Sequence, residues 1–398
     1  MRILNLTAFL SVLLTPFLSS AQNATVSPYS MFGLGDMETG SAGMYVGMGN
    51  VSLALRNKSY INGSNPASLT SLSENTFLFG AGLYGEYRQL TQTGTSESSV
   101  LGNLKNLTFG FRLCRSLYAS AGIIPLTSVG YALKTTEPME GSGSLATTYY
   151  EGDGGLNKVY IGTAWQISKN LSAGINWGYV YGTIRQAEVQ NGSSVQKESF
   201  THMFYPDFGI QYVQPVDKDQ SFTLALTYGY RQKMRLDNTL TVTTSSEAQI
   251  TEQPGSWQYL PQYMGVGASW STDKVLLALD YYKRDYGQMR KDAHEITFTN
   301  QHQLNVGLDF MTEKRTQITH WLLGASMANT YMMVKEKKGY QFSVSAGMAI
   351  PTKTIGMLGV GLKYERQFYK HKTGINENRI SLNFNVQLGE LSLIRKLQ

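Results

Sequence analysis

The sequence contains a single cysteine, Cys114, so it has no internal disulfide framework. Proline is also scarce, with 10 residues in 398, which suits long strands because proline cannot donate a ladder hydrogen bond. After residue 21, no apolar run approaches the ~18 residues that a membrane-spanning helix needs. The formal net charge of +6 is spread along the chain and forms no basic block, so we expect no nucleic-acid partner.

Signatures of catalysis and of cofactor binding are absent as well. No phosphate-binding or dinucleotide-binding glycine loop occurs, and histidines and cysteines do not cluster. The five histidines have no serine and aspartate at a spacing that predicts a nucleophile with its base. Glu151 and Asp153 supply two carboxylates, which are too few for a calcium site. We therefore expect no enzyme activity, no cofactor and no metal ion.

The first 21 residues have the features of a secretory signal peptide. Arg2 precedes an apolar run over residues 3–18, and the small residues Ser19 and Ala21 occupy the positions that a signal peptidase inspects. A buried helix is the alternative, but the run is short and stands at the N-terminus. We therefore expect export, with a mature chain that begins at Gln22.

After residue 75, the sequence is dominated by alternation of apolar and polar residues. In residues 379–388, apolar side chains such as Ile380 and Leu382 occupy one face of a strand. Polar side chains such as Asn383 and Asn385 occupy the other face. A tilted strand of about ten residues spans a bilayer. Fourteen such segments predict strands near residues 76–90, 104–114, 117–133, 157–167, 171–184, 200–212, 222–236, 259–270, 275–286, 298–310, 319–331, 340–350, 356–366 and 379–388.

The links between these segments alternate between short and long. Residues 115–116 and 168–170 are tight turns, whereas residues 134–156 and 237–258 are long links. Outer-membrane barrels have short periplasmic turns, longer external loops and an even number of strands. We therefore predict an all-β fold, a 14-stranded antiparallel transmembrane β-barrel in the cell outer membrane, with both chain ends in the periplasm. A soluble β-sandwich is the alternative, and the strand length and the aromatic-rich strand ends disfavour it.

Two stretches ahead of the first predicted strand resemble a known family. Residues 48–55 are followed by Asn65-Pro66-Ala67, and together they resemble the N-terminal hatch of the FadL family of outer-membrane transporters for hydrophobic compounds. The triplet matches the family's NPA motif.

The resemblance extends over nearly the whole mature chain. Two further segments resemble sequences of the family, namely Gly122-Ile123-Ile124-Pro125 and Leu260-Pro261. The resemblance implies a signal peptide over residues 1–21, a hatch over residues 22–75, a fourteen-stranded barrel over residues 76–389 and a periplasmic tail over residues 390–398.

The resemblance also implies a function, which is passive transport of hydrophobic or amphipathic, fatty-acid-like small molecules. Family members are proposed to release ligand sideways, through a gap in the wall beside a kink in the third strand. Gly122 and Pro125 stand in that strand, and Pro125 favours a gap because proline marks bulges and strand edges. An ordinary bulge is the alternative.

Gating is assigned to the hatch residues Asn65, Pro66 and Ala67. The asparagine side chain can bond nearby backbone, and the proline fixes the turn that follows. The alternative is that the triplet only docks the hatch on the barrel wall.

Residues 27–36 resemble the Bacteroidetes branch of the family, which includes PorV-like proteins of secretion. The alternative function is therefore a barrel that binds protein partners in secretion or surface assembly, with residues 237–258 as a docking surface. The expected partners are outer-membrane lipid and a hydrophobic ligand or, under this alternative, secretion or surface proteins.

Charged residues remain on the lumen side once the apolar face of each strand is assigned to lipid. Arg88, Arg112 and Arg379 are the candidates for binding a ligand carboxylate. Pairing with opposite charges across a wet interior is the alternative role for each of them. The sequence does not select among the three arginines.

Overall fold

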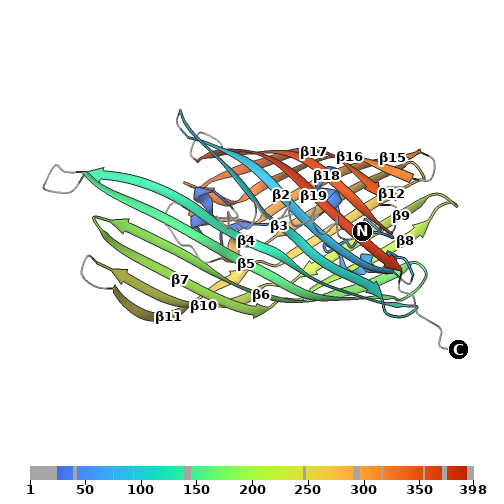
Figure 1. Ribbon diagram of the computed structural model, residues 1–398, viewed down its shortest axis with the longest axis horizontal. Helices are drawn as coiled ribbons and strands as arrows, with labels where there is room; N and C mark the ends of the chain where they lie inside the picture. Colours follow the sequence, from blue (N-terminus) through green and yellow to red (C-terminus); the bar gives the residue numbers. More distant parts are fainter. Residues whose placement is uncertain are drawn as a thin grey trace, which may run out of the picture.

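The chain folds into a closed antiparallel β-barrel that holds its own N-terminal segment (Figure 1). The structure is a computed structural model, and it describes residues 25–38, 43–74, 76–92, 94–138, 145–244, 248–289, 296–314, 317–352, 355–369 and 374–391. The predicted signal peptide lies outside these ranges, as do residues 392–398 of the predicted tail. Among the described helices, none has the length and apolar character that crossing a membrane requires.

The wall of the barrel has fourteen strands, which confirms the predicted fold class. The sheet contains nineteen segments, of which β1 (Asp36–Met37) belongs to the N-terminal part, and four strands consist of two consecutive segments each. The last strand pairs with the first and closes the barrel. The strands are β2 (Thr76–Gln92), β3 (Thr95–Arg112), β4 (Leu117–Pro138), β5 (Leu145–Gln166), β6 (Leu171–Gln190), β7 (Ser193–Phe204) with β8 (Asp207–Pro215), β9 (Ser221–Gly229) with β10 (Gln232–Thr243), β11 (Ala248–Leu260) with β12 (Tyr263–Ser271), β13 (Val275–Arg284), β14 (Ile296–Phe298) with β15 (Gln301–Lys314), β16 (Gln317–Val334), β17 (Lys337–Pro351), β18 (Ile355–Tyr369) and β19 (Asn376–Leu391).

Each predicted segment overlaps one of these strands, but several strands extend further at the hairpin end. Most of the predicted loop over residues 134–156 is strand, because β4 runs to Pro138 and β5 begins at Leu145. Residues 237–258 likewise form most of the hairpin between β10 and β11. The extensions show no alternation of apolar and polar residues, because both faces of a strand that projects into water are solvated. The segments predicted as long loops are therefore mostly strands, and their hairpins form a rim at this end of the barrel.

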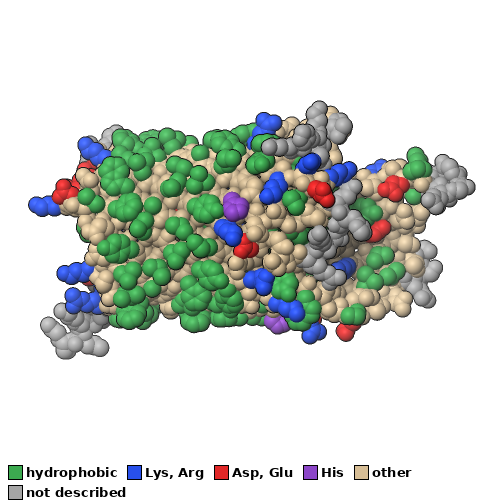
Figure 2. All heavy atoms as spheres, turned by 180° about the vertical axis from the view of Figure 1, so that it is seen from behind, with side chains coloured by type: hydrophobic (Ala, Val, Ile, Leu, Met, Phe, Trp, Pro, Cys, Tyr) green, Lys and Arg blue, Asp and Glu red, His purple; other side chains and the backbone are tan. Residues whose placement is uncertain are grey.

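Lipid-facing and lumen-facing residues alternate along the wall, as the sequence pattern predicts. On β19, Leu382 and Phe384 are exposed on the outside, whereas Asn383 and Asn385 are buried on the inside. Figure 2 shows apolar side chains gathered in a band over the part of the wall nearer the turns, with the hairpins beyond it. The apolar band and the closed wall place the protein in the outer membrane, with the short turns on the periplasmic side.

The N-terminal residues occupy the lumen in two layers. The outer layer, residues 25–38, contains β1 and lies towards the hairpins, where the Ser27 hydroxyl donates to Glu377 at the start of β19 (2.7 Å). The hatch, residues 43–74, lies towards the turns. The N-terminal segment therefore lies inside the barrel, whereas the two chain ends, which are predicted to be periplasmic, lie outside the described residues. The 3-10 helices are η1 (Pro28–Met31) in the outer layer, η2 (Gly43–Met48) and η3 (Pro66–Ser71) in the hatch, and η4 (Tyr286–Gln288) after β13.

Wall glycines let the hatch lie directly against the barrel backbone. A Cβ atom at Gly324 on β16 would collide with the backbone of Met48 and Gly49. A Cβ atom at Gly174 on β6 would collide in the same way with Pro66. The lumen therefore has no room for side chains at these contacts, and the plug packs backbone against backbone.

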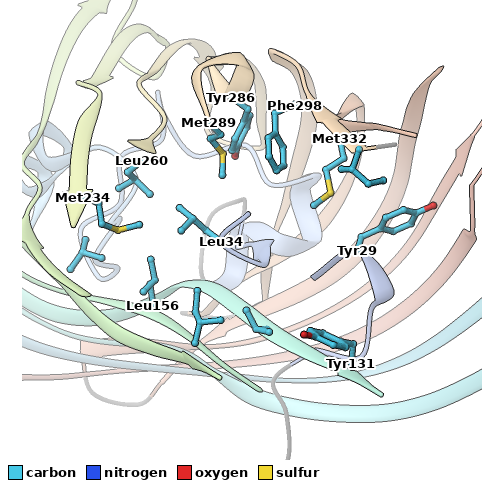
Figure 3. Close-up of a cluster of buried hydrophobic side chains, with 14 of the residues drawn as sticks. Tyr29, Leu34, Tyr131, Leu156, Met234, Leu260, Tyr286, Met289, Phe298 and Met332 are labelled. Atoms are coloured by element: carbon cyan, nitrogen blue, oxygen red, sulfur yellow. The ribbon is translucent and has the colours of Figure 1, made fainter. Parts of the chain in front are cut away.

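The outer layer closes the other half of the lumen with apolar side chains. Leu34 is fully buried at the centre of this cluster (Figure 3). Burial of a leucine side chain contributes about 1.5–3 kcal/mol, so the cluster holds the outer layer in place. The cluster includes Tyr29, Tyr131, Leu156, Met234, Leu260, Tyr286, Met289, Phe298 and Met332.

Candidate functional site

The NPA triplet begins η3 and is completely buried. Asn65 is the N-cap, and its Oδ1 accepts a hydrogen bond from the Ala67 amide (3.0 Å), which satisfies a free donor at the helix start. Pro66 takes the first helical position, where a missing amide hydrogen costs nothing. The Asn65 Nδ2 donates to the Leu53 carbonyl (2.9 Å) and to the Ile210 carbonyl on β8 (3.4 Å). One side chain therefore joins the helix, the hatch loop and the wall.

Wall residues hold the same hatch loop, residues 52–54, by its backbone. The Asp280 carboxylate on β13 accepts hydrogen bonds from the amides of Ser52 (2.6 Å) and Leu53 (3.0 Å). The Gln211 Nε2 on β8 donates to the Leu53 carbonyl (2.7 Å). These contacts are those of a docked hatch, in which the sequence analysis assigned no role to Asp280.

Arg56 adds a further polar contact between the hatch and the wall. Its guanidinium donates to Gln211 (2.8 Å) and to Thr70 within the hatch (2.9 Å). Burial lowers the pKa of Arg56 to about 10, so the side chain stays protonated at neutral pH.

The wall is interrupted between β3 and β4. Their hydrogen-bonded register ends at the pair Leu107 and Ile123, although both strands continue towards the hairpins. Pro125 follows immediately, and the register between β4 and β5 shifts between Pro125 and Thr127. Among the described residues, β3 beyond this point pairs with β2 alone. Figure 1 shows the two strands diverging. The pairing ends beside the predicted residues Gly122 and Pro125.

A cavity of about 210 Å³ lies behind this gap, between the hatch and the outer layer. Leu104, Ile124 and Pro125 line it from the two strands that flank the gap. Most of the exposed lining surface is apolar, although the lining also includes charged side chains. The remaining lining residues are Met37, Glu38, Gly63, Ser64, Lys105, Asn106, Thr108, Leu126, Lys158, Tyr160, Tyr205, Asp207, Leu260, Pro261, Tyr263, Tyr282, Arg284 and Tyr286.

The polar groups of the cavity are of several kinds, and they include the charged side chains Glu38, Lys105 and Arg284. Lys158 and Asp207 form a buried ion pair, which leaves no net charge at that point. Asn106 Oδ1, Thr108 Oγ1 and Tyr160 Oη are buried and have no hydrogen-bond partner among the described residues. An uncharged hydrogen-bonding group on a ligand would satisfy such atoms. Over the described ranges, no group of three histidine, cysteine, aspartate or glutamate residues could hold a metal ion.

Two of the three candidate arginines come together, and the third stands apart. Arg88 on β2 pairs with Asp36 (3.1 Å) and Glu86 (2.9 Å). Arg379 on β19 pairs with Glu365 (3.0 Å) and with Glu377, which also lies 3.8 Å from Arg88.

Arg112 instead pairs with Glu74 at the turn end of the barrel. The carboxylates around Arg88 and Arg379 already neutralise both guanidinium groups. The Arg88–Asp36 pair ties the outer layer to the wall, and the pairs of Arg379 with Glu365 and Glu377 lie within the wall, on β18 and β19.

The fourteen-stranded wall, its apolar band and its filled lumen define an outer-membrane β-barrel protein. A sequence model of the BamG family matches residues 3–394, and the chain belongs to this family. None of the curated proteins matches the sequence significantly.

Solved structures with the same fold are similar to this chain at low sequence identity. The toluene transporter TbuX of Ralstonia pickettii has a TM-score of 0.60 at 12% identity, over 87% of this chain and 98% of its own. The toluene transporter TodX of Pseudomonas putida has a TM-score of 0.58 at 13% identity, over 91% and 100%. A FadL homologue of Pseudomonas aeruginosa has a TM-score of 0.56 at 11% identity, over 91% and 100%. The FadL resemblance is thus confirmed at the level of the fold.

Replacing Asn65 with alanine tests how far this side chain holds the hatch. The change leaves the Ala67 amide without its acceptor and removes one donor from the Leu53 carbonyl, at about 1–3 kcal/mol for each buried group left unsatisfied. We expect the amide hydrogens of residues 52–70 to exchange at least about ten-fold faster, with the barrel intact. Lys58→Ala is the control, because the Lys58 side chain is exposed on the hatch. Equal exchange rates in the two variants would contradict the docking role.

Proposed function

We propose that the protein is a passive outer-membrane channel for small hydrophobic or amphipathic molecules, which leave its lumen sideways. The observation that carries the proposal is the position of the cavity. It lies where hydrogen bonding between β3 and β4 ends, so a molecule in the cavity faces this interruption of the wall.

The axial route through the barrel is closed at two levels, which supports a lateral path. The hatch packs against wall glycines, and the apolar cluster around Leu34 occupies the outer half of the lumen beside a polar cavity of about 110 Å³ next to Arg88 and Arg379. A sideways exit needs neither layer to leave the barrel. It also needs no energy source, because an apolar molecule moves downhill from the cavity into the bilayer.

The size and lining of the cavity suit a single ring or a short chain. An apolar protein cavity of about 150 Å³ holds benzene, and this cavity is somewhat larger. The structures of TbuX and TodX are described as toluene transporters, and that of CymD as a monoaromatic hydrocarbon channel. The unpartnered hydroxyl groups of Thr108 and Tyr160 add a polar end, so we include small phenols and alcohols among the substrates.

Filling the cavity tests this route. Gly63 lines the cavity, and an added Cβ atom would meet only Tyr160 Oη, at an ordinary 3.4 Å. Gly63→Phe therefore places a ring in the cavity without a clash at its base. We expect uptake of radiolabelled toluene and p-cresol by cells that carry the protein to fall at least five-fold, at equal amounts of folded barrel.

The matched control is Gly85→Phe on β2, where a Cβ atom has no neighbour closer than 3.9 Å and the cavity is not touched. Uptake that is the same with and without the protein, for toluene, p-cresol and decanoate alike, would refute the transport proposal.

Binding of a protein partner is the second candidate function, and the rim of hairpins favours it. Val100, Leu145 and Ile250 lie near the hairpin ends and are 78%, 68% and 70% exposed. Apolar side chains so exposed on a rim that projects into water are a feature of interaction surfaces. Membership of the BamG family, in place of a match to a curated transporter, keeps this candidate open.

Purification in mild detergent distinguishes the two candidates. Under the partner hypothesis, a protein co-purifies in a fixed ratio and is lost from the double variant Leu145→Ser with Ile250→Ser, because its apolar contacts are removed. Gln249→Ser is the control on the same hairpin and leaves the ratio unchanged. A partner that stays bound to the double variant, or toluene uptake by the purified barrel alone in liposomes, counts against this second function.

A further inference from the structure

β4 exchanges one hydrogen-bonding partner for another at the gap. After Ile123 it no longer pairs with β3, and β1 takes the vacated edge with Asp36 opposite Ser128 and Met37 opposite Thr127. The Glu38 amide extends the contact by donating to the Leu126 carbonyl (3.0 Å). β1, a two-residue strand of the outer layer, thus replaces β3 as the hydrogen-bonding partner of β4.

On its other side, the same segment reaches across the gap with side chains only. The Asp36 carboxylate pairs with Arg88 on β2 (3.1 Å), and the Glu38 carboxylate lies 3.8 Å from Lys105 on β3. The Tyr84 hydroxyl on β2 also donates to Glu38 (3.4 Å). The segment is therefore bonded to β4 by its backbone and to the opposite edge by two ion pairs.

The same residues border the cavity. Met37, Glu38 and Lys105 line it together with Ile124 and Pro125, which flank the gap. The segment thus stands at the place where a molecule would have to pass from the cavity into the gap.

Few contacts have to break for the segment to move. β1 has two residues, whereas the wall strands beside it have about twenty, and local opening is easiest where hydrogen bonds are few. Gly33 and Gly35 precede it with φ angles of +69° and +90°, a left-handed conformation that glycine adopts without strain. These two residues allow the chain to turn sharply on either side of Leu34, which stays anchored in the apolar cluster.

We infer that residues 36–38 are the gate of the lateral opening, held shut by the ion pairs Asp36–Arg88 and Glu38–Lys105 and opened when the segment leaves the edge of β4. This inference rests on the proposed transport function. It assigns gating to the outer layer, whereas the NPA triplet of the hatch serves to dock the plug.

A disulfide across the gate tests the inference. Met37 and Thr127 are directly opposite each other, and opposed residues of antiparallel strands have Cα atoms about 4.5–5.5 Å apart, within the range that a disulfide spans. In a Cys114→Ser background, Met37→Cys with Thr127→Cys should lower toluene uptake at least ten-fold when oxidised, and reduction should restore it. Ser194→Cys with Thr243→Cys, opposed on β7 and β10 away from the gap, is the control and should leave uptake unchanged.

A second variant weakens the ion pairs that hold the gate shut, and its effect is measured by chemical labelling, without a transport assay. Lys105→Met keeps the length of the side chain and removes its ion pair with Glu38. A cysteine at Ser128, which is 2% exposed beneath β1, should then react with a maleimide three- to ten-fold faster. Lys169→Met, in a turn at the other end of the barrel, should leave the labelling rate unchanged.

The two measurements separate failure of the gate from failure of transport. Uptake that survives oxidation of the Met37–Thr127 pair overturns the gate and leaves the transport function standing. Absence of uptake by the parent protein refutes transport, and the labelling of Ser128→Cys then decides alone whether the segment moves. Labelling that Lys105→Met does not accelerate overturns the inference.

Discussion

The end of the β3–β4 ladder at Leu107 and Ile123 is the constraint from which the rest of the site follows. A barrel normally satisfies every backbone group of its wall by pairing each strand on both sides. Pro125 lacks an amide hydrogen, the register of β4 shifts just beyond it, and β4 no longer pairs with β3 from this point on. The exposed edge of β4 then needs new partners, and β1 supplies them. The cavity behind the gap exists because the two strands no longer close over it.

The two layers of the N-terminal segment have different mechanical roles. The hatch is held by buried contacts to the wall, in which Asp280 and Gln211 bond the backbone of Leu53 and glycines such as Gly324 admit the chain. The contacts of residues 36–38 are fewer, and they include two side-chain ion pairs. A permeable state therefore needs no displacement of the hatch, since only a short segment of the outer layer moves.

Sequence reasoning was most accurate where a local pattern of residues reflects the surroundings of each side chain in the folded protein. Alternation such as that of Leu382 and Asn383 records a wall between lipid and lumen, so all fourteen strands could be placed. Asn65 was found because Asn65-Pro66-Ala67 matches the NPA motif of the family that the sequence resembles. The network of Arg88 and Arg379 could not be found, because Arg379 meets Arg88 only when β19 closes on β2. The role of Asp36 and Glu38 was missed for the same reason, since a two-residue strand has no periodicity and its partners lie about ninety residues away.

Disulfide trapping between β3 and β4 tests the interruption of the wall most directly. If the ladder continued four residues beyond Leu107 and Ile123, Asn103 would face Thr127. In a Cys114→Ser background, Phe109→Cys with Ala121→Cys lies within the observed register and should cross-link readily under mild oxidation. Asn103→Cys with Thr127→Cys should stay reduced under the same conditions, because β1 stands between the two strands. Efficient cross-linking of Asn103→Cys with Thr127→Cys would show a closed wall and contradict the lateral opening.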